Sequence, residues 1–155
     1  MIHQGRAYLA AACLLVAACH SESPSAATPP SASPTVATAA DTQVYSGIGS
    51  RETVHFTGTE PFWGGEVSGE TLTYETPDNQ VGRMVAVSRF AGRNGLSFSG
   101  ELDDMPFVLA VTPGQCSDGM SDRSYPFTAT LQVDGQQRKG CAWTDKQPYN
   151  GAAQP

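Results

Sequence analysis

The sequence of 155 residues predicts an all-β protein: a small antiparallel β-barrel of seven to eight strands, closed by one disulfide, after a signal peptide and a disordered linker. Three observations favour this fold. No helical periodicity after residue 41 is longer than one turn, whereas apolar and polar residues alternate repeatedly. Clusters of Gly, Pro, Asn and Asp separate the alternating segments at short spacing. A closed barrel also leaves no unpaired strand edge in so small a domain.

The N-terminal segment, residues 1–18, has the layout of a secretory signal peptide. Arg6 lies near the free amino terminus, and residues 7–18 are almost all apolar. This apolar stretch is too short to span a bilayer as a permanent helix. The run Leu15-Val16-Ala17-Ala18-Cys19 resembles the lipobox of bacterial lipoproteins. The resemblance implies that Cys19 is acylated and becomes the first residue of the mature chain. The alternative is a secreted chain without an anchor, in which this cysteine is incidental.

A linker rich in Ser, Pro, Ala and Thr follows at residues 19–41. It contains four prolines and one aliphatic residue larger than Ala. Such a segment buries too little apolar surface to offset the entropy of ordering, so we expect a disordered spacer. The several acyl chains of a lipoprotein cysteine would hold the protein at a bilayer. In the bacterial lipoproteins that this segment resembles, an Asp directly after the acylated cysteine is the mark of retention in the inner membrane. His20 stands at this position here, which favours the outer membrane, facing the periplasm.

Residues 42–146 are expected to form one folded domain, and residues 147–155 a disordered tail. A domain of this size has room for a single core and is small enough to benefit from a covalent crosslink. Strict alternation predicts strands around residues 53–57, 71–75, 96–99 and 127–133. Two continuous apolar segments are expected in the middle of the sheet or under cover on both faces, at residues 84–87 and 107–111.

The last hairpin allows a prediction of register. Asp134-Gly135 is typical of a two-residue turn. That turn would place Arg138 on the apolar face and leave Cys141 and Trp143 on the polar face. We therefore expect a loop of three or five residues instead. The three-residue loop pairs Val133 with Gln137, Leu131 with Lys139, Ala129 with Cys141 and Phe127 with Trp143.

Cys116 and Cys141 are the only cysteines after the signal region. In an exported domain such a pair is typical of a disulfide. Closing the loop between them would stabilise the fold by roughly 3–4 kcal/mol on the chain-entropy model. A redox-active or metal-binding pair is the alternative, but there is no Cys-x-x-Cys and no neighbouring His.

Two longer motifs carry a resemblance. The runs Gly58-Thr59-Glu60-Pro61-Phe62-Trp63 and Cys116-Ser117-Asp118-Gly119-Met120-Ser121-Asp122, with Gly140-Cys141-Ala142, resemble a family of uncharacterised bacterial envelope lipoproteins. The likeness covers roughly residues 55–143. The resemblance implies an envelope location and a compact β-domain. It implies no activity, because the family has none that is settled. A more distant similarity to META-domain and lysozyme-inhibitor types of small β-lipoproteins rests on architecture alone.

The first motif contributes three residues to a candidate binding patch. Pro61 is expected to fix a turn, and the aromatic residues after it to open a strand. Trp63 is interpreted as a plug of the barrel, with a ligand platform as the alternative. Glu60 either accepts hydrogen bonds from backbone amides or faces a ligand. The whole candidate patch consists of Glu60, Phe62, Trp63, Asp118, Met120, Asp122 and Arg123.

The second motif is interpreted mainly as a turn that satisfies its own polar groups. Asp and Ser side chains can accept bonds from amides two residues on, and Gly119 can take positive φ. A cation site at Asp118 and Asp122 is the alternative, but the calcium-loop pattern is absent, so we expect no metal and no cofactor. A bidentate pair between Arg123 and an acid of the two motifs, with Glu60 as the candidate, is expected to bring both motifs into one patch.

Catalysis finds little support in the sequence, and we expect no catalytic residue. His20 lies in the linker, and His55 alternates with apolar neighbours as a surface position would. Gly92-Arg93-Asn94-Gly95 lies between strands and opens no helix, unlike a phosphate loop. Acidic residues are plentiful, but nothing singles out a glycosidase-like pair.

The formal net charge of −6 disfavours nucleic acid and anionic head groups as partners. The sequence therefore predicts a lipid-anchored envelope protein with a non-catalytic β-domain that binds a protein or a small envelope component. One alternative is an inhibitor of a cationic cell-wall hydrolase, which needs a protruding loop with unpaired acids. The acidic turn Glu101-Leu102-Asp103-Asp104 is a candidate for that loop, although a solvated hairpin tip is the preferred interpretation of it. Another is a structural or stress-protective lipoprotein. Small-ligand binding would need a concave apolar mouth near Phe62, Trp63 and Tyr125.

Overall fold

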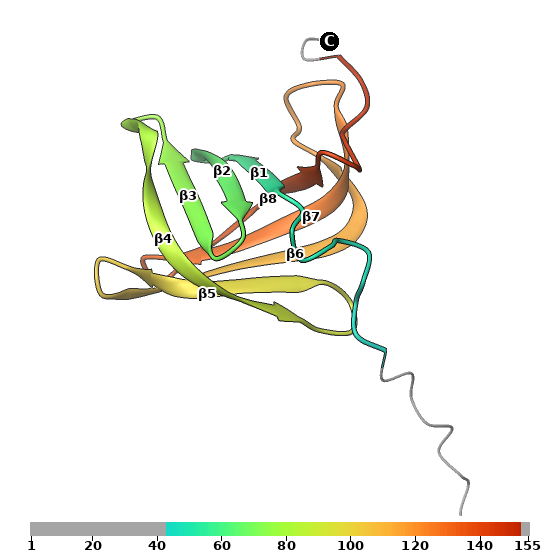
Figure 1. Ribbon diagram of the computed structural model, residues 1–155. Coiled ribbons are helices and arrows are strands. Elements are labelled where there is room, and N and C mark those ends of the chain that lie inside the picture. The colour runs from blue at the N-terminus through green and yellow to red at the C-terminus, as the bar shows by residue number, and fades with distance from the viewer. Residues whose placement is uncertain (1–42, 153–155) are drawn as a thin grey trace, which may run out of the picture. The chain divides into compact units, whose positions relative to one another are not determined.

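The computed structural model describes residues 43–152, and it confirms the all-β barrel with its disulfide. Eight antiparallel strands pair in sequence order and close into a barrel (Figure 1). The predicted signal peptide, the Cys19 acylation and the linker lie outside the described residues. The strands are β1 (Val54–Thr59), β2 (Phe62–Ser68), β3 (Thr71–Thr76), β4 (Asn79–Ala91), β5 (Leu96–Leu102), β6 (Met105–Ser117), β7 (Ser124–Val133) and β8 (Gln136–Thr144).

The core follows the period-two pattern of the sequence, because successive side chains of a strand point to opposite faces. In β1, Val54 and Phe56 are buried, and in β7 the inward set runs from Phe127 to Val133. The largest fully buried side chains include Phe56, Phe107, Leu72, Leu109 and Leu131. Each such side chain contributes about 1.5–3 kcal/mol by leaving water. No helix long and apolar enough to cross a membrane occurs among residues 43–152.

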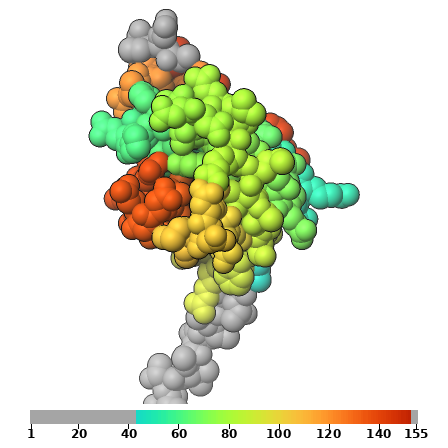
Figure 2. Space-filling model, turned by 90° about the vertical axis from the view of Figure 1, so that its left-hand side faces the viewer, coloured from blue at the N-terminus to red at the C-terminus, as the bar shows by residue number. Residues whose placement is uncertain are grey.

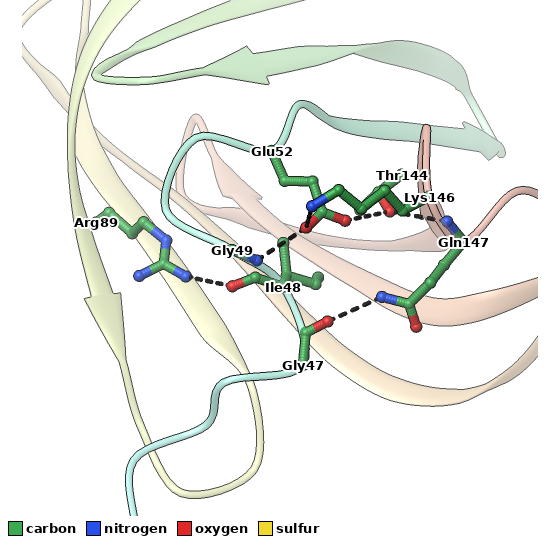
Figure 3. Close-up of polar contacts among 8 residues, drawn as sticks. All are labelled: Gly47, Ile48, Gly49, Glu52, Arg89, Thr144, Lys146 and Gln147. Atoms are coloured by element: carbon green, nitrogen blue, oxygen red, sulfur yellow. Dashed lines mark hydrogen bonds and ion pairs between the residues drawn. The ribbon is translucent and has the colours of Figure 1, made fainter.

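The segment before β1 closes one end of the barrel. Ile48 is 1% exposed and belongs to the core cluster. Its carbonyl accepts a hydrogen bond from Arg89 Nη2 at 2.9 Å, and the carbonyl of Gly47 accepts one from Gln147 Nε2 at 2.9 Å (Figure 3). The backbone amide of Tyr45 donates to Gly92 at 2.8 Å. The Ile48 side chain therefore closes this end of the core, and hydrogen bonds from Arg89 and Gln147 to the backbone hold it in place.

Glu52 ties this closing segment to the far end of the chain (Figure 3). Its carboxylate accepts bonds from the Gly49 amide at 3.0 Å and the Thr144 hydroxyl at 2.8 Å, and it pairs with Lys146 at 3.4 Å. The Gly49 amide is the main cause that lowers the pKa of Glu52, and the bonds from Thr144 and Lys146 add to it against the effect of burial. The carboxylate thus has a structural role in joining the two chain ends of the domain.

The predicted odd-length loop between β7 and β8 is wrong. Val133 pairs with Gln136, so the turn has two residues, and both Asp134 (φ 51°) and Gly135 (φ 70°) are left-handed, as a type I′ turn requires. Leu131 consequently pairs with Arg138, and the inward positions of β8 also include Gly140 and Ala142. Two features make this register acceptable: Arg138 lies at the open end of the barrel, and a second layer of chain covers the outward face of β8.

The tip of the β6–β7 hairpin forms that second layer. The register of the two strands shifts between Pro113 and Cys116. Cys116 is bonded to the outward Cys141 of β8, with a Cα–Cα distance of 5.6 Å, which confirms the predicted disulfide. Residues 113–126, called here the fold-back hairpin, continue the β6–β7 ladder past this shift as far as Ser117–Ser124. The disulfide to β8 and the bond from Thr59 of β1 to Asp118 hold this hairpin to the outer wall of the barrel.

Residues after β8 complete the outer layer. Ser124 and Asn150 exchange backbone hydrogen bonds of 2.8 and 2.9 Å. Tyr149 packs on Tyr125 and Trp143, with ring centroids 5.3 and 5.5 Å apart. These three rings form the external aromatic cluster, which shields the outward Trp143. The packed domain therefore extends past residue 146, where the sequence predicts its end, and the expected tail at 147–155 has fixed contacts up to Asn150.

Candidate functional site

The two sequence motifs meet on the outer wall of the barrel. The hydroxyl of Thr59, at the end of β1, donates to the carbonyl of Asp118 in the fold-back hairpin at 3.2 Å. Between them lies a groove of about 400 Å³, called here the outer groove. Its lining comes from the three strands β1, β7 and β8 and from the fold-back hairpin: Thr57, Gly58, Thr59, Cys116, Ser117, Asp118, Thr128, Ala129, Thr130, Lys139 and Gly140.

The position of the groove follows from the strand register. Thr57 of β1 and Thr128 of β7 both pair with Cys141 of β8, so these three residues form one row across the outer face. The disulfide to Cys116 covers this row. The ladder between β1 and β8 ends at Thr57–Cys141, so the remainder of β1 and the first residues of β8 do not pair with each other. The groove runs along this unpaired seam, and Lys139 stands on its wall.

The groove offers hydroxyl groups and one cation. Thr128 donates to the Thr112 carbonyl at 3.3 Å, and Thr59 is bonded to Asp118. The hydroxyls of Thr57 and Thr130 have no hydrogen-bond partner among residues 43–152, and Lys139 is exposed and forms no ion pair there. This combination suits a polar ligand with hydroxyl or anionic groups better than an apolar one.

Asp118 forms the turn that the sequence predicts. One carboxylate oxygen accepts the amides of Met120 at 3.0 Å and Ser121 at 2.9 Å, and the other accepts the hydroxyls of Ser121 at 2.7 Å and Tyr125 at 3.1 Å. Burial alone would raise the pKa of Asp118, but these bonds outweigh it and lower the pKa to about 2. Gly119 has the expected positive φ of 72°. Asp118 thus holds one wall of the groove in place.

This network predicts a pH dependence of stability. The pKa of Asp118 is about 2 in the folded state, below the value of about 3.9 in an unfolded chain. Its stabilising effect is therefore complete above pH ~4 and is lost as the pH falls through 2. We expect Asp118→Asn to lower the free energy of unfolding by about 1 kcal/mol at pH 7, allowing for solvent screening, and by much less at pH 2.

Denaturant unfolding at several pH values checks this expectation. Asp78→Asn is the control, because Asp78 is an exposed turn residue with no hydrogen bond or ion pair among the described residues. Parallel pH curves for wild type and Asp118→Asn would contradict the assignment.

The predicted pair between Arg123 and Glu60 is wrong. The Arg123 guanidinium lies over the ring of Tyr149, 4.4 Å from its centroid. A side-chain hydrogen bond with Tyr125 is the main cause that raises the pKa of Arg123. Glu60 is exposed and forms no ion pair within residues 43–152. The external aromatic cluster holds the guanidinium by a cation–π contact, so Thr59, and not this pair, joins the two motifs.

Trp63 lies in the core, 3% exposed, as the interpretation of a barrel plug requires. Its ring occupies space that side chains would otherwise take: a Cβ on Gly58 would lie 2.1 Å from its Nε1, and one on Gly140 2.8 Å from its Cζ2. Phe62 is 52% exposed and lines a second hollow of about 350 Å³. Tyr125 belongs to the external aromatic cluster, so the expected mouth of Phe62, Trp63 and Tyr125 does not form.

The candidate patch is therefore brought together only in part. Asp118 lines the outer groove, Phe62 and Trp63 line the second hollow, and Thr57-Gly58 borders both. Met120 is 60% exposed and Asp122 is exposed, and neither lines these hollows. The sequence pointed to neither Thr57 nor Lys139 as a site residue. The outward threonines of β1 and β7 indicated a polar outer face. The unpaired seam could not be predicted from them, because it depends on where the ladder between β1 and β8 ends.

His55 is not the plain surface residue that the sequence predicts. Its ring stacks on Trp143, with centroids 5.3 Å apart, and its two nitrogens face Glu66 at 3.5 Å and Asp145 at 3.1 Å. Both nitrogens are engaged by carboxylates on opposite sides, so the two acids do not converge on one point. Among residues 43–152, no group of three or more His, Cys, Asp or Glu side chains is placed to hold a metal ion.

Comparisons with known proteins add no relative. No protein-family model matches the chain, and neither a curated protein nor a solved structure is similar to it at a significant level.

Proposed function

We propose that this chain is a lipid-anchored protein of the bacterial cell envelope whose barrel is a non-catalytic binding module. In this proposal Cys19 carries the anchor and residues 19–41 separate the barrel from the membrane. The support for export is the lipobox-like run before Cys19, together with a disulfide, which is typical of oxidising compartments. The proposed orientation is toward the periplasm at the outer membrane.

The outer groove is the observation that carries the proposed binding function. A disulfide, the Thr59–Asp118 bond and the bonds around Asp118 hold its walls, so little order has to be created when a ligand enters. Its volume of about 400 Å³ falls in the range of small-molecule sites. The free hydroxyls and Lys139 point to a polar envelope component that carries hydroxyl and acidic groups.

Lys139→Glu is the variant that tests this proposal. Lys139 is exposed and unpaired within the described residues, so the substitution should leave stability within about 0.5 kcal/mol of wild type. We expect the immobilised full chain to retain envelope components from an extract, and Lys139→Glu to retain them several-fold less. Quantitative mass spectrometry of the bound fraction measures the difference.

Arg93→Glu provides a matched control. It makes the same change of charge at an exposed, unpaired position in the turn between β4 and β5. It should retain the same components as wild type. Equal retention by wild type and Lys139→Glu would contradict binding in the outer groove, and an equal loss with both variants would reduce the effect to net charge.

One feature supports the second candidate function, inhibition of a cationic cell-wall hydrolase. The turn between β5 and β6 projects from the barrel (Figure 1). Asp104 in this turn and Glu101 near the end of β5 are exposed and form no ion pair among residues 43–152. Asp103, between them, is bound by Arg83 in a bidentate pair. A hydrolase in the bound fraction, retained by Lys139→Glu as well as by wild type, would favour this candidate over the groove.

A further inference from the structure

The end of the barrel opposite Ile48 is open, and polar side chains surround its mouth. The β3–β4 end, the β5–β6 turn and the β7–β8 turn surround a recess on the face that Figure 2 shows. The cavity has a volume of about 220 Å³. Leu102 is 8% exposed and Tyr74 6%, and the Tyr74 ring packs edge-on against Phe107 at 5.5 Å. The mouth thus has a firm, partly apolar floor.

Arg138 brings an uncompensated cation into this mouth. It pairs with Leu131 and therefore points to the inside of the barrel. Its Nη1 donates to the Tyr74 hydroxyl oxygen at 2.7 Å, while its Nε is buried and has no partner among the described residues. It forms no ion pair there, unlike Arg83, which Asp103 engages on both nitrogens. A partly buried guanidinium with a free edge is costly unless a carboxylate or similar acceptor meets it.

Asp134 supplies the opposite charge on the same cavity. It lines the mouth and forms no ion pair within residues 43–152, so it lies beyond contact distance of Arg138. Burial is the main cause that raises the pKa of Tyr74; the charge of Arg138 lowers this pKa and that of Asp134 raises it, so both charges act on the mouth. With Arg83 and Asp103 neutralising each other, the mouth presents one free cation and one free anion.

We propose that this mouth binds a small zwitterion, an α-amino acid by class, with its carboxylate on Arg138 and its ammonium group on Asp134. The Tyr74 hydroxyl accepts from Arg138, and its own proton is free to donate to the carboxylate as a second contact. The volume lies below the range of 300–1,000 Å³ typical of drug-sized ligands, which suits a small ligand. The balance of charge disfavours a dianion such as phosphate. This site is separate from the outer groove and does not depend on the proposed function.

Titration of the isotope-labelled full chain with alanine, followed by backbone amide NMR, tests the proposal. We expect the amides around Tyr74, Asp134 and Arg138 to shift together in a saturable way. Arg138→Gln should weaken binding roughly tenfold to a hundredfold, since it removes a charge-assisted pair. Asp134→Asn should weaken it severalfold, and it keeps the turn because Asn tolerates positive φ.

Tyr74→Phe removes the hydroxyl and retains the ring, so it reports on the site even if Arg138→Gln folds poorly. We expect it to weaken alanine binding severalfold. Acetate and phosphate serve as comparison probes, and both should bind more weakly than alanine. Acetate or phosphate binding as tightly as alanine would overturn the assignment of a zwitterion. An absence of shifts at the mouth with alanine, or equal binding by wild type, Tyr74→Phe and Asp134→Asn, would overturn the site itself.

Discussion

Replacing Cys116 and Cys141 together by serine is expected to lower the free energy of unfolding by about 3–4 kcal/mol. The disulfide joins residues separated by 25 positions, and removing it restores the freedom of that loop in the unfolded chain. Such a loss is a large share of the stability of a small domain. The fold-back hairpin would keep only weaker contacts with the outer wall, among them the Thr59–Asp118 bond. Denaturant unfolding of the variant and of the wild type measures the difference.

The wild type in a strong reductant is the control, and it should unfold with the same midpoint as the double-serine variant. The same change should also weaken retention of ligands in the outer groove, because Cys116 forms part of its wall. A variant that unfolds within 0.5 kcal/mol of the wild type would show that the disulfide is not a major stabilising element.

Replacing Trp63 by alanine is expected to lower the free energy of unfolding by about 3–5 kcal/mol, the usual cost of a buried aromatic residue. The ring fills the space that Gly58 and Gly140 leave beside the unpaired seam, and it packs on Phe56 with centroids 5.8 Å apart. Alanine would leave a cavity lined by backbone, which neighbouring side chains cannot fill. Thermal and denaturant unfolding give the magnitude.

Phe62→Ala is the matched comparison, because Phe62 is the preceding residue in β2 and is half exposed. It should change stability by no more than about 0.5 kcal/mol. If both variants are destabilised equally, Trp63 is not the plug of the barrel. The pair of variants thus separates a core role of the motif from a general sensitivity of the β1–β2 turn.

The strands of the core could be predicted because burial on one face of a strand is written into alternate residues. The segment of β7 from Phe127 to Val133 is an example, and its inward side chains are those that the sequence indicates. The same reasoning failed at β8. There Cys141 and Trp143 are apolar but point outward, and Arg138 is charged but points inward. An apolar residue in the pattern indicates that its side chain is buried. It does not indicate whether that side chain is buried inside the barrel or between the outer wall and the fold-back hairpin.

The candidate site depended more strongly on distant contacts. Asp118 and its neighbours make a local turn, so their hydrogen bonds could be foreseen from residues two and three positions apart. The pairing of His55 with Asp145 spans 90 positions, and the position of Arg123 over Tyr149 depends on where the chain after β8 returns. No local pattern contains that information, so the ion pair with Glu60 was a wrong prediction.

The fold class, the pairing of Cys116 with Cys141 and the self-bonded turn around Asp118 could be predicted from the amino-acid order alone, because each rests on local periodicity, cysteine number or near neighbours. Signal peptide, lipid anchor and linker stay predictions, since they lie outside residues 43–152. The register of β8, the fold-back hairpin with the outer groove, and the open mouth with Arg138 and Asp134 became known only from the folded barrel. These features depend on where strand ladders end and which surfaces the chain covers twice, and such long-range contacts are settled only when the barrel closes.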